Sequence, residues 1–306
     1  CSSGNSGSAT SMRNQPTDRE QEALEKARQI RRKKTRREYW TKMVLNLVLV
    51  GIAFTFSLPF VWMVLTSLKP LAEVGTGSWL PKTVQWSNYS KVFDVIPFAR
   101  FYWNSIFVAC WITFLQVVTA SLAAFSFSRL EWPGRDKVFI LYLATQMIPG
   151  LILIIPNYQI MVKLGLVDTF VGLVLPGAFT AYGTFLLRQF MMTIPRSLDE
   201  AAEIDGASKL QIYWHIILPM ARPGIITLAI FTFLGAYRSF FWPLVMLKNQ
   251  ARYTLPIGLL SFSSSHGQST HLLMAAVTMS VVPVILVFVF LQKRLVRGIQ
   301  MGAVKG

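Results

Sequence analysis

Six apolar stretches, each close to the length needed to cross a lipid bilayer, dominate this chain and are separated by shorter polar segments. A helix rises about 1.5 Å per residue, so about twenty apolar residues match a hydrocarbon core about 30 Å thick. Pro149, Gly150 and Pro156 interrupt the third stretch. The pattern predicts an all-α membrane protein with six transmembrane helices. The expected spans are 43–68, 104–128, 138–161, 169–187, 224–247 and 272–291.

One polar segment, Ser197–Pro223, interrupts the chain between the fourth and fifth stretches. Ser197 and Glu200 have the spacing of a capping box, which predicts a helix that begins at Ser197 with its first N–H groups satisfied by these two side chains. Gly206 suits the left-handed residue that ends a helix. The segment is therefore expected to begin with a short helix and a tight turn.

A second short helix is predicted directly after this turn. Ser208 and Gln211 repeat the capping-box spacing. Pro219 ends the helix, and Pro223 fits the first turn of the long apolar helix that follows. The prediction is helix, turn, helix, held between two membrane spans.

The first of these short helices carries a smooth face. Leu198, Ala201 and Ala202 fall at helical spacing, and the small residues among them let a partner approach closely. Acidic side chains form a rim beside this face, which indicates a basic partner. They are Glu200, Glu203 and Asp205.

Composition agrees with a membrane assignment. The chain of 306 residues is 53% hydrophobic and only 14% charged, with a mean hydropathy of +0.46. The net charge of +16 does not indicate nucleic-acid binding, because eleven of the thirty Lys and Arg residues precede position 43. A basic block beside a membrane span sets topology or contacts anionic lipid. Residues 1–42 are expected to form a basic, partly disordered cytoplasmic segment, and residues 43–306 a membrane domain.

The basic residues are unequally divided between the two sides of the predicted membrane domain. One side has eleven Lys and Arg in the N-terminal segment, three and four in the connections after the second and fourth spans, and four in the tail. The connections on the other side have four, one and two. The positive-inside rule therefore predicts that both termini and Ser197–Pro223 are cytoplasmic. The 69–103 and 248–270 loops are expected to face outward.

The chain offers no catalytic motif. It has no Gly-rich phosphate loop ending in Gly-Lys-Ser/Thr, so no nucleotide is expected to bind by that route. The histidines His215, His266 and His271 lack metal-ligand spacing, and Cys1 and Cys110 form neither a metal nor a redox motif. A membrane protein without a catalytic constellation is typically a transporter, a channel or an assembly subunit. Neither an enzyme nor a metal site is predicted.

Polar residues inside the apolar stretches are the candidates for a substrate path. Arg238 lies within FLGAYRSFFWPL, and a charge at that depth faces a protein interior or a water-filled path, or snorkels outward. Tyr237 and Trp242 offer rings that stack on sugars, with interfacial or packing roles as the alternatives. Three further candidates flank the proline breaks of the third stretch: Gln146, Asn157 and Tyr158.

The stretch EAAEIDGASKLQIYWHIILPMARP resembles the EAA loop of ABC-importer permeases, with its spacing complete. The residues that carry this resemblance are Glu200, Ala201, Ala202, Asp205, Gly206, Ala207, Pro219 and Pro223. Other segments resemble the carbohydrate-uptake branch, of the MalG type. They are Asn104-Ser105, AAFSFSR at 123–129, Met147-Ile148-Pro149, Ile194-Pro195, FWPL at 241–244 and, most specific to the branch, GIQMGAVKG at 298–306. The likeness covers residues 42–306.

This resemblance implies a coupling mechanism. Ser197–Ser208 would be the coupling helix that docks in a cleft of a cytoplasmic ATPase subunit, with Glu200 paired to a basic residue there and Gly206 making the turn sharp. ATP and Mg²⁺ would be bound by the partner ATPase subunits, and this chain would need no cofactor. The tail would reach the ATPase dimer interface, and its implied contacts are Gln300, Gly302 and Lys305.

The resemblance also implies an assembly in the bacterial inner membrane. The partners would be a second, MalF-like permease subunit, two ATPase subunits, the lipid bilayer, and an external substrate-binding protein that touches the 248–270 loop. The expected cargo is a sugar, an oligosaccharide or a sugar derivative. The family usually has Trp-Asn where this chain has Tyr237-Arg238, so the cargo is expected to be unusual for the branch.

Other functions are compatible with parts of the pattern. The importer could carry a polyol phosphate, an amino acid or a peptide, although the MalG-like tail disfavours amino acids. A free-standing channel or secondary transporter is disfavoured, because the sequence shows neither duplicated halves nor a chain of intramembrane acids. A scaffold protein of the membrane would leave the EAA-like stretch a coincidence.

Overall fold

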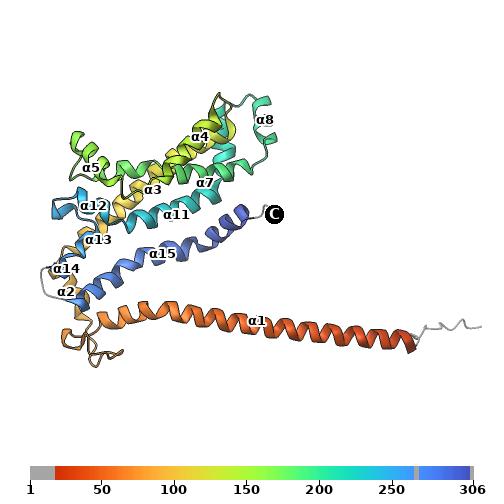
Figure 1. Ribbon diagram of the computed structural model, residues 1–306, viewed down its shortest axis with the longest axis horizontal. Coiled ribbons are helices and arrows are strands. Elements are labelled where there is room, and N and C mark those ends of the chain that lie inside the picture. Colours follow the sequence, from red (N-terminus) through yellow and green to blue (C-terminus); the bar gives the residue numbers. More distant parts are fainter. Residues whose placement is uncertain (1–17, 265–268, 304–306) are drawn as a thin grey trace, which may run out of the picture. The chain divides into compact units, whose positions relative to one another are not determined.

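The computed structural model describes residues 18–264 and 269–303, and the surroundings of side chains in 39–262 and 269–290 (Figure 1). All regular secondary structure in these ranges is helical, which confirms the all-α class for the described part of the chain. Lys305 lies outside the described residues. Gln300 and Gly302 belong to helix α15, beyond the described side chains.

The chain divides into two compact units, Cys1–Val61 and Trp62–Gly306. Helix α1 runs without a break from Asp18 to Ser67, so the basic segment and the first apolar stretch are one helix. Its apolar part, Tyr39–Ser67, is long and apolar enough to cross a membrane.

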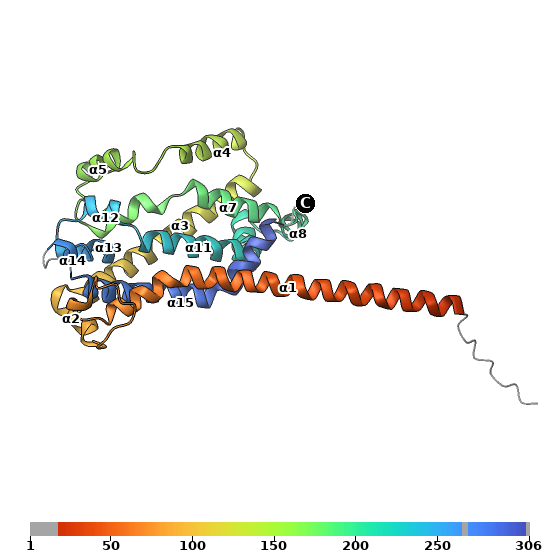
Figure 2. The ribbon, with the colours of Figure 1, turned by 60° about the horizontal axis from the view of Figure 1, so that its bottom comes forward.

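The second unit is built around α3, Phe98–Arg129. Helices α7 (Ala181–Met192) and α11 (Arg222–Tyr237) pack along α3, and α15 (Thr270–Ala303) packs against α11 (Figures 1 and 2). Small side chains on α3 permit this close packing, because they let neighbouring backbones approach. The buried ones are Ser105, Ala109, Ala120, Ser121, Ala124 and Ser128.

The third apolar stretch is not one transmembrane helix. It forms α4 (Arg135–Ala144), the 3-10 turn η2 (Thr145–Met147) and α5 (Ile154–Lys163). Pro149 and Gly150 lie between the helical pieces, since proline lacks the N–H that would continue the hydrogen-bond ladder and glycine disfavours the helix. The predicted interruption of the stretch at Pro149 and Gly150 is therefore confirmed, whereas Pro156 lies in the first turn of α5 and does not break it.

The fourth and fifth stretches are bent. The fourth contains α6 (Phe170–Val174), the turn η3 (Leu175–Ala178) and α7, with a bend of 45°. The predicted second short helix forms as α9 (Lys209–Ile212), the π-turn η4 (Tyr213–Ile217) and α10 (Leu218–Met220), and the chain bends by 74° before α11, where the fifth stretch begins. It continues after a break as α12 (Phe241–Met246).

Three helices of the described residues are long and apolar enough to cross a membrane, or five if each bent pair is one span. They lie in α1, α3 and α15, and the bent pairs end in α7 and α11. Short helices complete the described chain. They are η1 (Leu71–Glu73), α2 (Ser87–Val95), α8 (Ser197–Ile204), η5 (Gln250–Arg252), α13 (Leu255–Gly258) and α14 (Ser261–Ser264).

Two glycines of α11 test the packing of this bundle. A Cβ at Gly224 would stand 2.6 Å from Cδ2 of Phe190 on α7, whereas a Cβ at Gly235 would meet nothing within 4 Å. We expect Gly224→Ala to lower the free energy of unfolding by about 1–3 kcal/mol, because the aromatic ring must shift. Gly235→Ala, the matched control, is expected to raise it by up to about 1 kcal/mol through helix propensity. Thermal unfolding of the purified variants in detergent measures both, and equal effects would contradict the packing.

Candidate functional site

Helix α8 begins at Ser197, as predicted, but without the predicted cap. The N-cap residue is Arg196, and no side chain caps this end. One main-chain oxygen serves in place of a side-chain cap: Arg196 O accepts hydrogen bonds from the N–H groups of Asp199 at 2.9 Å and Glu200 at 3.1 Å. The expected capping box of Ser197 and Glu200 is therefore wrong, and the carboxylate of Glu200 is left for other contacts.

The turn after α8 follows the prediction closely. Gly206 has φ of 83°, the left-handed conformation that glycine adopts most readily. Its N–H donates to Glu203 O at 3.0 Å, and Ala207 N–H donates to Ala202 O at 2.9 Å, which is the Schellman pattern. This turn reverses the chain within two residues of the end of α8.

The second capping box is confirmed. Ser208 Oγ accepts from Gln211 N–H, and Gln211 Oε1 accepts from Ser208 N–H at 2.7 Å. Pro219 lies in α10, the last piece before the 74° bend into α11, so the helix ends there as expected.

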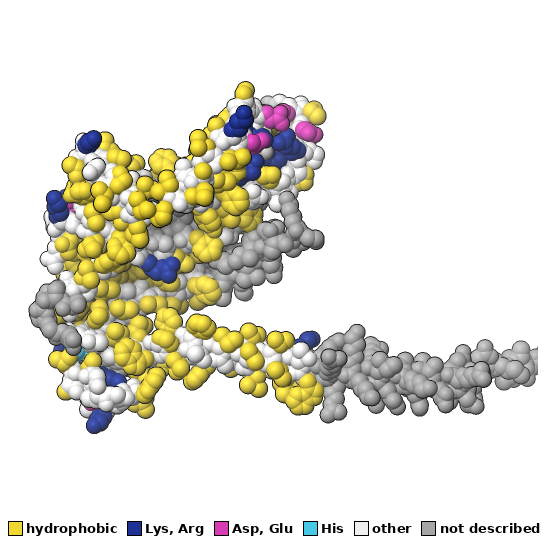
Figure 3. Space-filling model, viewed as in Figure 1, with side chains coloured by type: hydrophobic (Ala, Val, Ile, Leu, Met, Phe, Trp, Pro, Cys, Tyr) yellow, Lys and Arg dark blue, Asp and Glu magenta, His cyan; other side chains and the backbone are white. Residues whose placement is uncertain are grey.

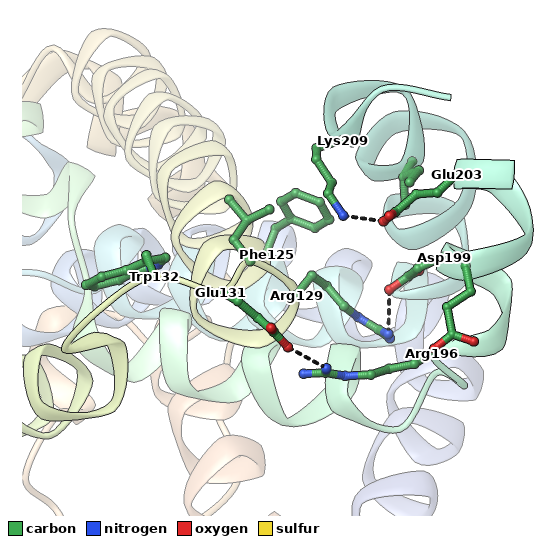
Figure 4. A pocket seen from close by; sticks show the side chains of 11 residues that line it. Phe125, Arg129, Glu131, Trp132, Arg196, Asp199, Glu203 and Lys209 are labelled. Carbon is green, nitrogen blue, oxygen red and sulfur yellow. Dashed lines mark hydrogen bonds and ion pairs between the residues drawn. The ribbon is translucent and has the colours of Figure 1, made fainter. Parts of the chain in front are cut away.

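A buried ion pair fixes α8 to the bundle. Arg129, the last residue of α3, donates from Nη1 to Asp199 Oδ2 on α8 at 2.8 Å. Its Nη2 donates to the carbonyl oxygens of Met191, at the end of α7, and of Ile194 at 2.8 Å. The Arg129 side chain is only 4% exposed. One guanidinium thus ties α3, α7 and α8 together (Figure 4).

Weaker charge pairs surround this buried one. Arg196 pairs with Glu131 at 3.0 Å, and Lys209 pairs with Glu203. Both pairs are largely exposed, and exposed pairs add little stability. With Arg129, Asp199 and Glu200 they line a cavity of about 580 Å³ between the end of α3 and α8 (Figure 4). Figure 3 shows the charged side chains gathered at this end, next to a mostly hydrophobic surface.

The exposed face of α8 differs in part from the expected one. Ala202 and Ala207 pack against the buried cluster around Leu187 and Met191, so they do not belong to the exposed surface. Leu198, Ala201 and Ile204 are exposed instead, with Ile204 at 87%. Residues three apart share one face of a helix, so these three form an apolar stripe. Sequence reasoning missed Ile204, which continues the three-residue spacing.

The acidic rim is partly used within the chain. Asp199 pairs with Arg129 and Glu203 with Lys209. In the described part of the chain, the carboxylates of Glu200 and Asp205 make no ion pair or side-chain hydrogen bond. These two remain open to a partner, whereas the prediction that Glu203 faces one is not supported.

The six candidates for a substrate path do not form one cluster. Tyr237 is 5% exposed, and its hydroxyl donates to Ser280 O at 2.9 Å, so it is a packing residue of the α11–α15 contact. Trp242 packs against the cluster around Met246. No hydrogen bond joins any two of the six candidates in the described residues. Arg238 and Gln146 are exposed, and Asn157 and Tyr158 are half-buried on α5.

A second polar cluster lies at the other end of α3. Asp168 has φ of 59°, and its Oδ1 accepts from the N–H groups of Lys248 at 3.0 Å and Asn249 at 3.1 Å. Its Oδ2 accepts from Arg252 at 2.6 Å. These donors, Asn249 N–H foremost, hold the pKa of the Asp168 carboxyl below its usual range.

The first turns of α3 hold the same loop. Asn104 donates to the carbonyl oxygens of Ala251 and Tyr253, both at 3.0 Å. Ser105 Oγ accepts from Leu255 N–H at 2.7 Å. Together with Asp168 these contacts, here named the loop clamp, pin residues 248–255 to the bundle. The sequence singled out Asn104 and Ser105 by resemblance only, and offered no signal for Asp168.

Within the residues whose side chains are described, no three His, Cys, Asp or Glu side chains are close enough to hold a metal ion. The two polar arrangements described above are the anchored α8, with its exposed apolar stripe, and the loop clamp at the far end of α3.

Comparison with known proteins gives a consistent result. The model of a family described as "Binding-protein-dependent transport system inner membrane component" matches residues 116–301. The arabinooligosaccharides transport system permease protein AraQ of Halalkalibacterium halodurans is 32% identical over 271 residues, 86% of this chain and 96% of AraQ. The trehalose transport system permease protein SugB of Mycobacterium tuberculosis is 34% identical over 275 residues, 89% of this chain and 98% of SugB.

A solved structure shares the fold. It is a chain of a bacterial ABC transporter involved in the import of the acidic polysaccharide alginate, with a TM-score of 0.74 and 26% sequence identity. The match covers 82% of this chain and 95% of that chain.

Asp199 tests the anchor of α8. We expect Asp199→Asn to lower the free energy of unfolding by about 3 kcal/mol or more, because the buried Arg129 guanidinium loses its counter-charge. Glu131→Gln, which removes only an exposed pair, should cost less than about 1 kcal/mol. Thermal unfolding in detergent measures both variants. Similar small losses in both would show that the buried pair does not hold α8.

Asp168 tests the loop clamp through pH. A carboxyl whose pKa is lower in the folded than in the unfolded protein stabilises the fold at any pH above its unfolded-state pKa, about 3.9 for Asp. This contribution is lost as the pH falls through the lower pKa of the folded state. We therefore expect the unfolding temperature to fall between about pH 5 and pH 2, and to fall less in Asp168→Asn. Asp94→Asn, at an exposed residue of α2, should keep the wild-type pH profile. An unchanged profile in Asp168→Asn would refute the assignment.

Proposed function

The chain belongs to the family of binding-protein-dependent transport system inner membrane components, and from that premise we propose that it forms one half of the translocation path of an ABC importer for sugars, oligosaccharides or sugar derivatives. It acts as a permease subunit and hydrolyses no ATP itself. Separate ATPase subunits bind ATP and Mg²⁺ and drive the transport cycle.

The observation that carries this proposal is the apolar stripe on a rigidly anchored α8. Leu198, Ala201 and Ile204 face away from the chain, while Asp199 on the same helix is tied to Arg129. A helix that docks in a partner and is also fixed to α3 and α7 transmits the partner's movement to the bundle. In this role Glu200 and Asp205 meet basic side chains of the ATPase.

The other residues of the EAA-like stretch support α8 in this role. Ala202 and Ala207 pack it onto the bundle, Gly206 provides the turn, and Pro219 precedes the bend into α11. The tail residues Gln300, Gly302 and Lys305 are proposed to contact the ATPase dimer. A second, MalF-like permease completes the path, and two ATPase subunits complete the motor.

The two polar ends of α3 are consistent with a membrane between them. Asn104 of the loop clamp and Arg129 of the α8 anchor are 25 positions apart, or about 37 Å along a helix, against about 30 Å for the hydrocarbon core. We place the Arg129 end and both termini in the cytoplasm, on the basis of the basic residues. The chain has six membrane spans if the broken third stretch also crosses the membrane, in addition to the three long helices and the two bent pairs.

The loop clamp then faces outward, where an external substrate-binding protein docks. Residues 248–255 are pinned by Asp168, Asn104 and Ser105, so the 248–270 loop starts from a fixed position. A pre-ordered surface binds a partner with a smaller entropy loss.

The cargo class rests on the relatives. The names of AraQ and SugB state arabinooligosaccharide and trehalose transport, and the solved neighbour imports alginate. All three are carbohydrates, which favours a saccharide over a peptide, whereas a permease of Yersinia enterocolitica named for sn-glycerol-3-phosphate transport, 32% identical over 228 residues, keeps a polyol phosphate as the alternative cargo. The long coverage of these importer permeases likewise disfavours a free-standing channel or secondary transporter.

Ile204 tests the coupling role. We expect Ile204→Asp to reduce ATP-driven uptake by about tenfold or more, because a buried apolar contact worth about 2 kcal/mol becomes a buried charge. The chain should still fold, since Ile204 is 87% exposed. Uptake and ATPase activity are measured in proteoliposomes that hold the complete importer with its binding protein.

Lys137→Gln is the matched control, because Lys137 is exposed on α4 and away from the stripe. Its uptake should equal that of the wild type. Normal uptake in Ile204→Asp would refute the coupling role of α8.

A further inference from the structure

Arg238 lies at the break between α11 and α12, inside the apolar part of the bundle. Its depth follows from a contact near the middle of α3, where Thr232 Oγ1 donates to Gln116 Oε1. Gln116 is about 18 Å from the level of Asn104 and about 20 Å from that of Arg129, by helical rise. Arg238 is six residues beyond Thr232, or about 9 Å towards the Asn104 end. A guanidinium at this level is still within the hydrocarbon core, whose half-thickness is about 15 Å.

The Arg238 side chain does not reach outward to the nearer interface. Its Nε donates to Leu234 O at 3.2 Å, one turn back along α11. The guanidinium is thus turned towards the middle of the bundle. Snorkelling, in which the charge reaches the headgroups, requires the opposite direction.

The chain supplies no counter-ion at this depth. None of the six apolar stretches contains Asp or Glu. Among the described residues, the two terminal nitrogens of Arg238 have no hydrogen-bond acceptor. Uncompensated charges at such depth pair with another group or face a water-filled cavity. Within the part of the chain that the structure describes, the terminal nitrogens of Arg238 are therefore left for an acceptor that another molecule brings.

The surface around Arg238 is open and suited to a saccharide. Phe231, Gly235 and Arg238 are exposed and lie on one face of α11, at i, i+4 and i+7. No atom of the described chain lies within 4 Å of a Cβ at Gly235, so there is open space one turn from the guanidinium. Phe241, 56% exposed, begins α12 just across the break. An open face with an exposed aromatic ring and a cation combines the groups that hold an acidic sugar.

We propose that Arg238 binds the anionic group of a negatively charged saccharide, a carboxylate, sulfonate or phosphate, as it passes through the path. The proposal rests on the importer function proposed above and deepens it. Arginine suits this role because its planar guanidinium donates two parallel hydrogen bonds to such groups and stays charged at any physiological pH. The interaction selects anionic over neutral cargo of the same size.

The test uses the complete importer in proteoliposomes with its own binding protein. The binding protein is first titrated by calorimetry with a neutral glucose trisaccharide, a uronate trisaccharide, and sulfated and phosphorylated glucose. Uptake of the uronate and neutral trisaccharides is then compared for the wild type, Arg238→Gln and Arg238→Lys. Arg100→Gln is the matched control, because Arg100 is exposed in the first turn of α3, outside both α11 and the EAA-like stretch. The readout is the ratio of anionic to neutral uptake.

We expect the binding protein to bind an anionic saccharide and Arg238→Gln to lower the uptake ratio at least about tenfold, the equivalent of one charge-assisted hydrogen bond. The ratio for Arg238→Lys should fall between those of the wild type and Arg238→Gln. The ratio for Arg100→Gln and the basal ATPase rate of each variant should equal those of the wild type.

Three results would overturn the role of Arg238 but leave the importer function standing. The first is a binding protein that binds only neutral saccharides, and the second is an uptake ratio that Arg238→Gln does not alter. The third is a loss of assembled complex in Arg238→Gln, which would show that the guanidinium pairs with a carboxylate of the second permease. Absence of ATP-driven uptake of every saccharide tested would instead overturn the importer function on which the proposal rests.

Discussion

The buried pair of Arg129 and Asp199 is the interaction on which the rest of the second unit depends. A guanidinium that is 4% exposed stays charged, so its cost of burial must be offset by charged and polar partners. Arg129 has three of them, a carboxylate oxygen on α8 and two carbonyl oxygens at and just after the end of α7, while its Nε and Asp199 Oδ1 have no hydrogen-bond partner among the described residues. Because these acceptors come from separate elements, the pair fixes where α7 ends and where α8 starts. This constraint determines on which side of α8 the exposed stripe lies.

The loop clamp applies the same logic at the opposite end of α3. Asp168 adopts a left-handed backbone that lets one carboxylate accept two backbone N–H groups and a guanidinium. Between the clamp and the α8 anchor, α3 carries small buried side chains and hydrogen bonds of short polar residues, such as Thr119 to Ala178 O at 2.6 Å. In the proposed coupling role, movement imposed on α8 would be passed along this closely packed helix. Arg238 differs from Arg129 and Arg252 because its two terminal nitrogens have no acceptor among the described residues, although its Nε donates to Leu234 O.

Local sequence signals predicted the features that depend on a few neighbouring residues. Gly206 takes its positive φ, Ser208 and Gln211 form their capping box, and the third stretch breaks at Pro149. The capping box at Ser197 failed because Arg196 O already accepts the N–H groups of Asp199 and Glu200. A spacing rule does not detect a main-chain competitor of this kind.

The sequence by itself determined the all-α class of the described residues, the positions of the apolar stretches and the two short helices joined by a glycine turn, because each follows from periodicity, length or one backbone conformation. Only the tertiary structure decided which side of α8 is exposed, that Tyr237 is buried while Arg238 is open, and that Asp168 holds the 248–255 loop. These outcomes depend on residues 43 to 84 positions apart in sequence, such as Tyr237 with Ser280 and Asp168 with Arg252. Side chains brought together by folding leave no periodic pattern along the chain, so packing and burial had to be seen in three dimensions.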